Sequence, residues 1–151
     1  MTTGTCGDPG PHPGASTPAV SQRMSRMRRR DNGPEMAIRR RLHARGLRYR
    51  VVWPVPGQRR RTIDIAFTRA RLAVYVDGCF WHGCPEHAHL PKANAGWWAQ
   101  KIAWNRARDA DVTRQLETLG WTVLRVWEHE DPEEVVERVV GWLRDRCAAD
   151  A

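Results

Sequence analysis

The chain has 151 residues, a formal net charge of +8 at pH 7 and 41% hydrophobic residues. This length suits one domain with its own core. The sequence contains no run of about 18 apolar residues and no apolar stretch near its N-terminus. These features argue against a membrane span and a secretory signal, and they predict a cytoplasmic protein.

The N-terminal part divides into a polar tail and a basic segment. Residues 1–20 are rich in Gly, Pro, Ser and Thr without a periodic pattern, which predicts a disordered tail. We expect residues 21–151 to form a single domain. Residues 21–61 carry fourteen Arg and only two acidic residues. Because Arg binds phosphate through its planar fork, this segment favours a nucleic-acid partner over an ordinary solvated surface.

The first half of the domain reads as one helix followed by strands. The segment 31–46 has the caps and spacing of a helix, and the alternating segment 47–55 predicts a strand. The stretch "GQRRR" (57–61) predicts a turn or a loop. Two further apolar strands, 62–67 and 72–77, are separated by a short turn, so we expect a hairpin.

The second half begins with a long segment of no regular period, 78–96. A loop of this length inside a compact domain is usually functional or held by a metal. Residues 97–120 predict a long helix, 121–129 a buried strand, and 131–147 a final helix with apolar residues at helical spacing. This order predicts a mixed α/β domain with helices packed on the sheet.

Two aspartates stand in the predicted hairpin. Asp64 lies inside an apolar strand, where an isolated carboxylate is costly to bury, and Asp77 ends the next strand. Carboxylates brought together at one end of a sheet favour a hard cation such as Mg²⁺, which supports phosphodiester cleavage. For Asp77 the alternative is a cap for the turn that follows.

A group of soft metal ligands follows Asp77 directly. Cys79, Cys84 and His87 form the pattern C-x4-C-x2-H, and His129 can supply a fourth ligand from the end of the last strand. Without a secretory signal, a zinc site is favoured over a disulfide framework. Two reduced surface thiols are the alternative. A zinc ion would explain how this long loop stays ordered.

Adjacent aromatic residues, Phe80 and Trp81, lie among these ligands. Both rings can project outward from a metal-held loop, and apolar wedges of this kind open and kink a DNA duplex. From the residues alone, ordinary loop packing is the favoured interpretation. His82 can act as a general base or can serve the zinc site. Asn105 and Asp109, four residues apart on the long helix, can reach this region or be solvated.

The stretch "DGCFWHGCPEH", taken with "TIDIAF", "WWAQKIAWNRARD" and "GWTVLRVWEHE", resembles the very short patch repair DNA mismatch endonucleases. The likeness runs from about Ser21 to Glu130 in the same order. It implies a restriction-endonuclease-like fold, a mixed sheet flanked by helices with a structural zinc. It also implies a Mg²⁺-dependent enzyme that nicks one strand beside the thymine of a T:G mismatch, left by deamination of 5-methylcytosine.

The resemblance also implies roles for individual residues. By this resemblance, Asp64 matches a magnesium-binding aspartate and His82 matches a catalytic histidine. Glu35 matches a glutamate near the site, and Asp109 matches an aspartate tied to metal-bound waters. The aromatic residues expected at the DNA are Phe80, Trp81 and Trp98. The zinc-ligand positions are Cys79, Cys84, His87 and His129. Asp77, where some members carry His, joins the catalytic set with its role open, and "RRTID" replaces the usual "GRPD".

We therefore expect a bacterial, nucleoid-associated monomer that acts on double-stranded DNA with a T:G mismatch, alongside mismatch-repair proteins that the sequence does not identify. The alternatives are a restriction-type or other DNA nuclease of the same fold and a non-catalytic DNA-binding module. Asp64 and His82 argue against the module. The pair Phe80 and Trp81 argues for mismatch opening over the cutting of matched DNA.

Overall fold

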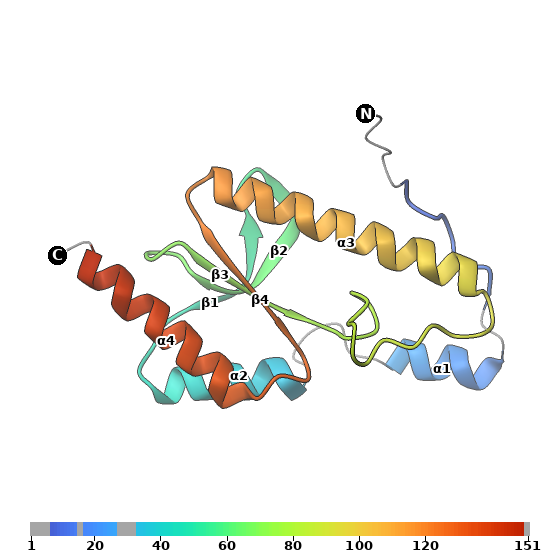
Figure 1. The fold of residues 1–151 in the computed structure, drawn as a ribbon, viewed down its shortest axis with the longest axis horizontal. Coiled ribbons are helices and arrows are strands. Elements are labelled where there is room, and N and C mark those ends of the chain that lie inside the picture. Colours follow the sequence, from blue (N-terminus) through green and yellow to red (C-terminus); the bar gives the residue numbers. More distant parts are fainter. Residues whose placement is uncertain (1–6, 15–16, 27–32, 150–151) are drawn as a thin grey trace.

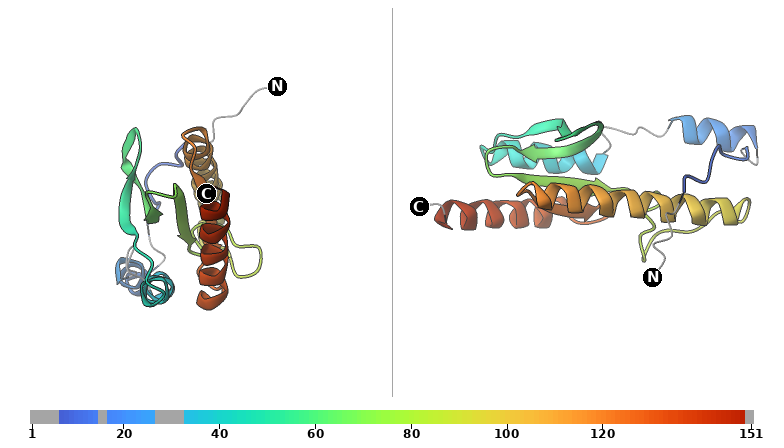
Figure 2. Two further views of the ribbon diagram at one scale, coloured as in Figure 1. Left: turned by 90° about the vertical axis from the view of Figure 1, so that its left-hand side faces the viewer. Right: turned by 90° about the horizontal axis from the view of Figure 1, so that it is seen from above.

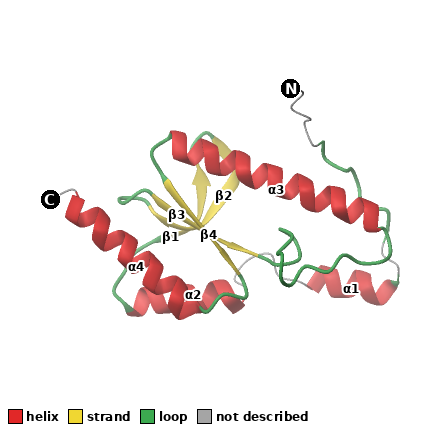
Figure 3. Ribbon diagram, in the orientation of Figure 1, coloured by secondary structure: helices red, strands yellow, loops and turns green. Residues whose placement is uncertain are grey.

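A four-stranded sheet lies between helices in the computed structural model, which describes residues 7–14, 17–26 and 33–149 (Figure 1). The elements in chain order are α1 (Pro18–Arg26), α2 (Gly33–Ala44), β1 (Arg50–Val55), β2 (Gln58–Phe67), β3 (Leu72–Asp77), α3 (Ala95–Thr118), β4 (Thr122–Trp127) and α4 (Pro132–Ala149). The strands lie in the order β1-β2-β3-β4. The first three are antiparallel and β4 runs parallel to β3, so the predicted mixed sheet with flanking helices is confirmed (Figure 3).

Both faces of the sheet are covered because the inner strands are apolar on both sides. On one face, Ile65 and Val74 pack in a core with residues of α2 and α4, including Val136. On the other face, Ala73 packs in a second core with Leu116 of α3. Figures 1 and 2 show the sheet between α3 on one side and the α2 and α4 pair on the other. This enclosure explains why β3 is buried at nearly every position.

Several functional residues predicted from the sequence, among them Asp77 and His82, lie near the ends of β3 and β4. These strands are parallel, with Tyr75 opposite Arg125 and Asp77 opposite Trp127 in the register. The chain leaves β3 into the segment 78–94, which leads to the start of α3 (Figure 1). Backbone hydrogen bonds hold this segment in tight turns, among them the 2.9 Å bond from the Cys84 N–H to the Cys79 carbonyl. The long loop is therefore folded although it contains no regular element.

The predicted order of helices and strands matches the structure from α2 to α4, but one boundary was wrong and one helix was missed. The stretch "GQRRR" is not a loop: β2 begins at Gln58, and only Pro56 and Gly57 make the turn. The strand extends because it pairs with β1, with Gln58 opposite Val55 and Thr62 opposite Pro54. Arg61 in this part of β2 also forms an ion pair with Asp111 of α3, at 2.9 Å. None of the helices in the described ranges has the length and apolar character to cross a bilayer.

The missed helix is α1 at the N-terminus, which begins at Pro18, inside the segment predicted as a tail. Thr17 accepts a hydrogen bond from the Val20 N–H at 3.3 Å. Thr before Pro is an N-cap followed by a favoured first helical residue, so the sequence did contain this signal. Within residues 7–14, the ring of His12 lies 4.6 Å from that of Trp97 in α3.

Candidate functional site

Asp64 lies on β2 with its side chain half-buried, and its Oδ2 atom accepts a hydrogen bond of 3.0 Å from the Val76 N–H of β3. Burial raises the pKa of Asp64 to about 6. The hydrogen bond opposes this shift, whereas the negative charges of Glu35 and Asp77 add to it. A carboxylate in these surroundings gains from a nearby cation, because a cation stabilises its charged form.

Glu35 reaches the same region from α2. It is 7% exposed, and its carboxylate forms an ion pair with Arg39 at 3.4 Å, one helical turn later. Its negative charge is one of the causes that raise the pKa of Asp64. Glu35 belongs to an element that lies about 30 residues earlier in the chain, and its role near the active site stays a prediction.

Asp77, the last residue of β3, is buried and forms a two-pronged ion pair with Arg125 of β4. The Arg125 Nε atom lies 2.8 Å from Oδ2 of Asp77, and the Nη2 atom lies 2.9 Å from Oδ1. Such a fork-shaped pair is stronger and more directional than a single charge contact. Asp77 therefore does more than cap the turn before Gly78.

His82, in the loop after β3, is held by Asp109 of α3. The Nδ1 atom of His82 lies 2.5 Å from the Asp109 Oδ2 atom and 3.9 Å from the Asp77 Oδ1 atom. Burial lowers the pKa of His82, but the hydrogen bond to Asp109 and the charge of Asp77 outweigh it and raise the pKa. With Nδ1 donating to Asp109, the Nε2 atom is the one available to exchange a proton with a substrate.

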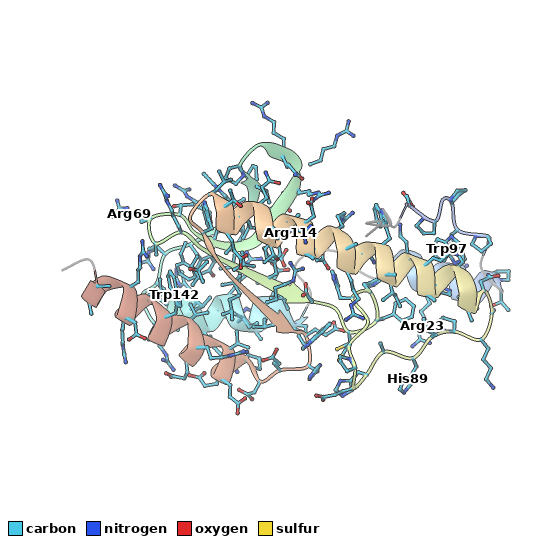
Figure 4. The ribbon with its side chains drawn as sticks, turned by 45° about the horizontal axis from the view of Figure 1, so that its top comes forward. Arg23, Arg69, His89, Trp97, Arg114 and Trp142 are labelled. Carbon is cyan, nitrogen blue, oxygen red and sulfur yellow. The ribbon has the colours of Figure 1, made fainter. Side chains whose placement is uncertain are left out.

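An open cavity of about 400 Å³ lies beside Asp77, His82 and Asp109, whereas Asp64 is not part of its lining. Arg114 of α3, labelled in Figure 4, lies at this cavity. The other charged, polar and aromatic residues that line the cavity are Asp77, His82, Arg106, Asp109, Thr113, Arg125 and Trp127. A basic rim around carboxylate and imidazole groups can hold a phosphate close to acid–base chemistry.

The four predicted zinc ligands converge. Ligand atoms of Cys79, Cys84, His87 and His129 all lie within 4.8 Å of one another. The Sγ atom of Cys79 is 3.1 Å from Nδ1 of His129, and the Sγ atom of Cys84 is 3.8 Å from Nδ1 of His87. Two thiols and two imidazoles form a donor set that suits tetrahedral zinc.

The surroundings support the loop that carries these ligands. Glu128 accepts a hydrogen bond of 2.8 Å from the Cys79 N–H. Burial and the neighbouring Cys84 raise the pKa of the Cys79 thiol to about 11, so the thiol is neutral without a metal. A bound zinc would reverse this shift because it stabilises the thiolate. Cys147, by contrast, is exposed on α4, and Cys6 lies outside the described residues.

The aromatic pair is half-buried in this structure, which agrees with the loop packing that the residues alone favoured. The rings of Phe80 and Trp81 lie 5.0 and 5.8 Å from that of Trp98. Trp98 itself is 4% exposed, and the ring of His12 lies 5.2 Å from it. The three rings form one edge-to-face cluster, which we call the aromatic cluster (Phe80, Trp81 and Trp98). Direct DNA contact by Trp98 would require its neighbours to move.

Two residues have contacts that sequence reasoning missed. Asn105, left open between the site and solvent, donates a 2.8 Å hydrogen bond to the Trp81 carbonyl and so supports the loop. Arg125 was treated as part of an ordinary buried strand. Its signal was present, because an Arg inside the apolar stretch "TVLRVW" needs a partner as much as an Asp inside "TIDIA" does.

Comparisons with known proteins give consistent results. The family model described as DNA mismatch endonuclease Vsr matches residues 16–87. The type II nicking enzyme V.NaeI of Lentzea aerocolonigenes is 39% identical over 137 residues, covering 89% of this chain and 82% of the relative. The type II nicking enzyme V.XorIIP of Xanthomonas oryzae pv. oryzae is 41% identical over 71% of this chain and 77% of its own. The DNA mismatch endonuclease Vsr of Escherichia coli is 31% identical, covering 82% of each chain.

Proposed function

This chain belongs to the Vsr family of DNA endonucleases, and from that premise we propose that it nicks one strand of DNA at T:G mismatches by Mg²⁺-dependent hydrolysis. The endodeoxyribonuclease activity follows from the family. The mismatch preference, the metal and the residue roles are our proposal. The observation that carries it is the arrangement of Asp64, the His82–Asp109 pair and the aromatic cluster around the end of β3.

We assign the catalytic Mg²⁺ to Asp64, with Glu35 as the nearby second carboxylate. The raised pKa of Asp64 and the further negative charge from Glu35 and Asp77 favour a hard cation there. When bound, Mg²⁺ would polarise the scissile phosphate and lower the pKa of a water molecule. The protein's own contribution is to hold the Asp64 carboxylate against β3 through the Val76 N–H.

His82 is the proposed general base or acid of the reaction. Its Nδ1 atom is bound to Asp109, so the ring is oriented and Nε2 is the atom available to move a proton. Asp109 thus acts on His82, whereas the resemblance implied a role at metal-bound waters. Asp77 belongs to the same group through its contact of 3.9 Å with His82.

We further propose a structural zinc bound by Cys79, Cys84, His87 and His129, whose ligand atoms converge within 4.8 Å. The metal would stiffen the loop that carries Phe80 and Trp81, which lie between Cys79 and Cys84 in the sequence. These rings are the proposed wedge at the mismatch, and the ring of Trp98 packs edge-to-face against both. The basic N-terminal segment would bind the phosphates of double-stranded DNA, with the protein acting as a monomer.

The test is a nicking assay with purified protein, Mg²⁺ and end-labelled duplexes that carry T:G, matched C:G or matched T:A at one position. We expect a cut in the thymine-containing strand of the T:G duplex only. Equal cutting of matched duplexes would identify a nuclease of another specificity. Binding without cutting, in the presence of Mg²⁺, would identify a non-catalytic module. His82→Gln is the matched inactive control.

A further inference from the structure

We infer that Arg125 is a positioning residue of this active site: its guanidinium, in place of a metal ion, joins Asp77 to Asp109, and through Asp109 it orients His82. The inference rests on the proposed nuclease function for its kinetic part only. Its structural part concerns the protein before Mg²⁺ or DNA binds and can be tested on its own.

The contacts of Arg125 support this inference directly. The guanidinium makes bonds of 2.8 and 2.9 Å to the two oxygens of Asp77. Its Nη2 atom also lies 3.3 Å from the Oδ1 atom of Asp109, whose other oxygen binds His82. One side chain of β4 therefore fixes a carboxylate on β3 and a carboxylate on α3 relative to each other.

The environment selects Arg over another cation. The centre of the guanidinium lies 4.6 Å from the ring centre of Tyr75, its register partner on β3. The Arg125 Nη1 atom is buried and has no hydrogen-bond partner within the described residues, and the cation–π contact with Tyr75 adds to the ion pairs that hold the guanidinium. A Lys ammonium is a single point of charge and cannot make the two-pronged bond, the Asp109 contact and the stack together.

The same contacts separate two groups of carboxylates. Oxygen and nitrogen atoms of Asp77, His82 and Asp109 lie within 4.8 Å of one another, a spacing at which they can hold a metal ion. Arg125 already supplies the cation there, with Asp77 bound through both oxygens. Asp64, by contrast, accepts a backbone hydrogen bond from the Val76 N–H. Asp77 is thus the anchor of Arg125, and Asp64 is the carboxylate left for the metal.

Removal of Arg125 has a specific consequence for His82. Asp77 and Asp109 would face each other without the cation, and Asp77, already 3.9 Å from Nδ1, would compete with Asp109 for the imidazole. If the charge of Asp77 is then also removed, Asp109 again becomes the single carboxylate partner. Arg125→Met should therefore disturb His82, and the double change Arg125→Met, Asp77→Asn should restore it.

The first test uses zinc-loaded protein without Mg²⁺. Long-range ¹H–¹⁵N spectra of the imidazole, assigned with His82→Gln, report which nitrogen carries the proton and whether it is hydrogen-bonded. We expect the Nδ1–H signal of His82 in the wild type, its loss or displacement in Arg125→Met, and its return in the double variant. An unchanged His82 signal in Arg125→Met, with the fold intact by circular dichroism, would overturn the inference.

The second test measures nicking kinetics on the duplex that the wild type cuts. Arg125→Met should lower kcat by about 10- to 100-fold, the usual effect of removing a supporting partner, with the KM for DNA almost unchanged. Arg125→Lys should remain impaired, and the double variant should recover part of kcat. The control is Arg138→Met, which removes the ion pair with Glu130 outside the site. That variant should retain full activity.

The outcomes separate the inference from the proposed function. A rise in KM alone for Arg125→Met would mean that Arg125 contacts DNA. Full activity of Arg125→Lys would mean that a positive charge alone is enough at this position. A double variant with a kcat no higher than that of Arg125→Met would show that Asp77 does not compete for His82. Each result overturns the inference. If the wild type cuts no T:G duplex, the proposed function fails, and the His82 spectra still decide the structural part.

Discussion

The Asp64 carboxylate and the Val76 amide are joined by a hydrogen bond of 3.0 Å between β2 and β3. Val76 precedes Asp77, so this bond ties Asp64 to the strand that leads into the loop with His82. An amide donor stabilises a charged carboxylate, but burial outweighs it here and the pKa of Asp64 rises to about 6. The site thus holds Asp64 in place at a cost to stability that a bound cation would offset.

Asp64→Ala should abolish nicking and leave mismatch binding largely intact. The proposed metal loses its main ligand, and metal stabilisation of charge is worth several kcal/mol, or roughly 10²- to 10⁴-fold in rate. The measurement is a single-turnover nicking assay at saturating Mg²⁺, with binding followed by titration of labelled T:G duplex. Cleavage within a few-fold of the wild type would refute the assignment of Asp64.

Asp64→Asn should make the metal-free protein more stable than the wild type, and this gain should appear only at pH values above the acidic range. In the unfolded chain Asp64 loses its proton near pH 3.8, whereas the folded state holds it up to about pH 6. The folded state therefore binds more protons in this window, and stability falls as the pH rises through it. At pH values above this window, the charged Asp64 lowers the free energy of unfolding by up to about 3 kcal/mol, because one pKa unit corresponds to 1.36 kcal/mol.

Thermal melting in buffer without added Mg²⁺, at pH 4 and pH 7.5, measures this effect. The difference in Tm between Asp64→Asn and the wild type should grow from the lower to the higher pH. The comparison between variants cancels the acid loss of zinc, which affects both. A difference that stays constant or shrinks would show that burial does not perturb Asp64. Asp145→Asn, at an exposed position of α4, provides the control for removing a surface carboxylate.

The fold was largely predictable because each element has a clear local pattern. The apolar strands around Asp64 and Asp77 and the apolar spacing of α4 predicted the right elements in the right order. The run Arg59–Arg61 was misread because charge suggests a loop, whereas the first part of β2 pairs with β1 and can carry exposed Arg. The charge of the run does not report this pairing between two strands.

The site was predictable in its residue types and much less in its pairings. Soft ligands at close spacing and a lone Asp in an apolar strand carry their own signal. The link between Asp77 and Arg125 depends on the parallel register of β3 and β4, which places residues about 50 positions apart side by side. The half-burial of Phe80 and Trp81 depends on packing against Trp98, and no periodicity in the loop reports it.

The protein should carry one tightly held zinc per chain, bound by Cys79, Cys84, His87 and His129. The ligand atoms already converge within 4.8 Å, and both thiols are buried. Metal analysis of protein purified without added zinc should find about one equivalent. Zinc retained by the double variant Cys79→Ala, Cys84→Ala would contradict the assignment. Cys147→Ala, a change of an exposed thiol on α4, should leave the zinc content unchanged.

The double variant Phe80→Ala, Trp81→Ala should lose most of its preference for T:G over C:G duplexes. The two rings lie in edge-to-face contact with Trp98. To act as a wedge they must leave part of this contact and enter the base stack, which costs a few kcal/mol per step. A mismatched step opens more easily than a paired one, so insertion of the rings favours the mismatched duplex. Stacking of the rings on the bases then contributes roughly 1–3 kcal/mol per base.

Binding isotherms for T:G and C:G duplexes at one ionic strength provide the test of this wedge. The preference should fall about tenfold or more in the double variant, since each 1.4 kcal/mol is a factor of ten. Affinity for matched DNA should survive and weaken with salt, because it depends on the arginines of residues 21–61. Leu90→Ala, a change of an exposed apolar side chain in the same loop, should change neither the preference for T:G nor the affinity for matched DNA. A double variant that keeps the wild-type ratio would show that the aromatic cluster only packs the loop.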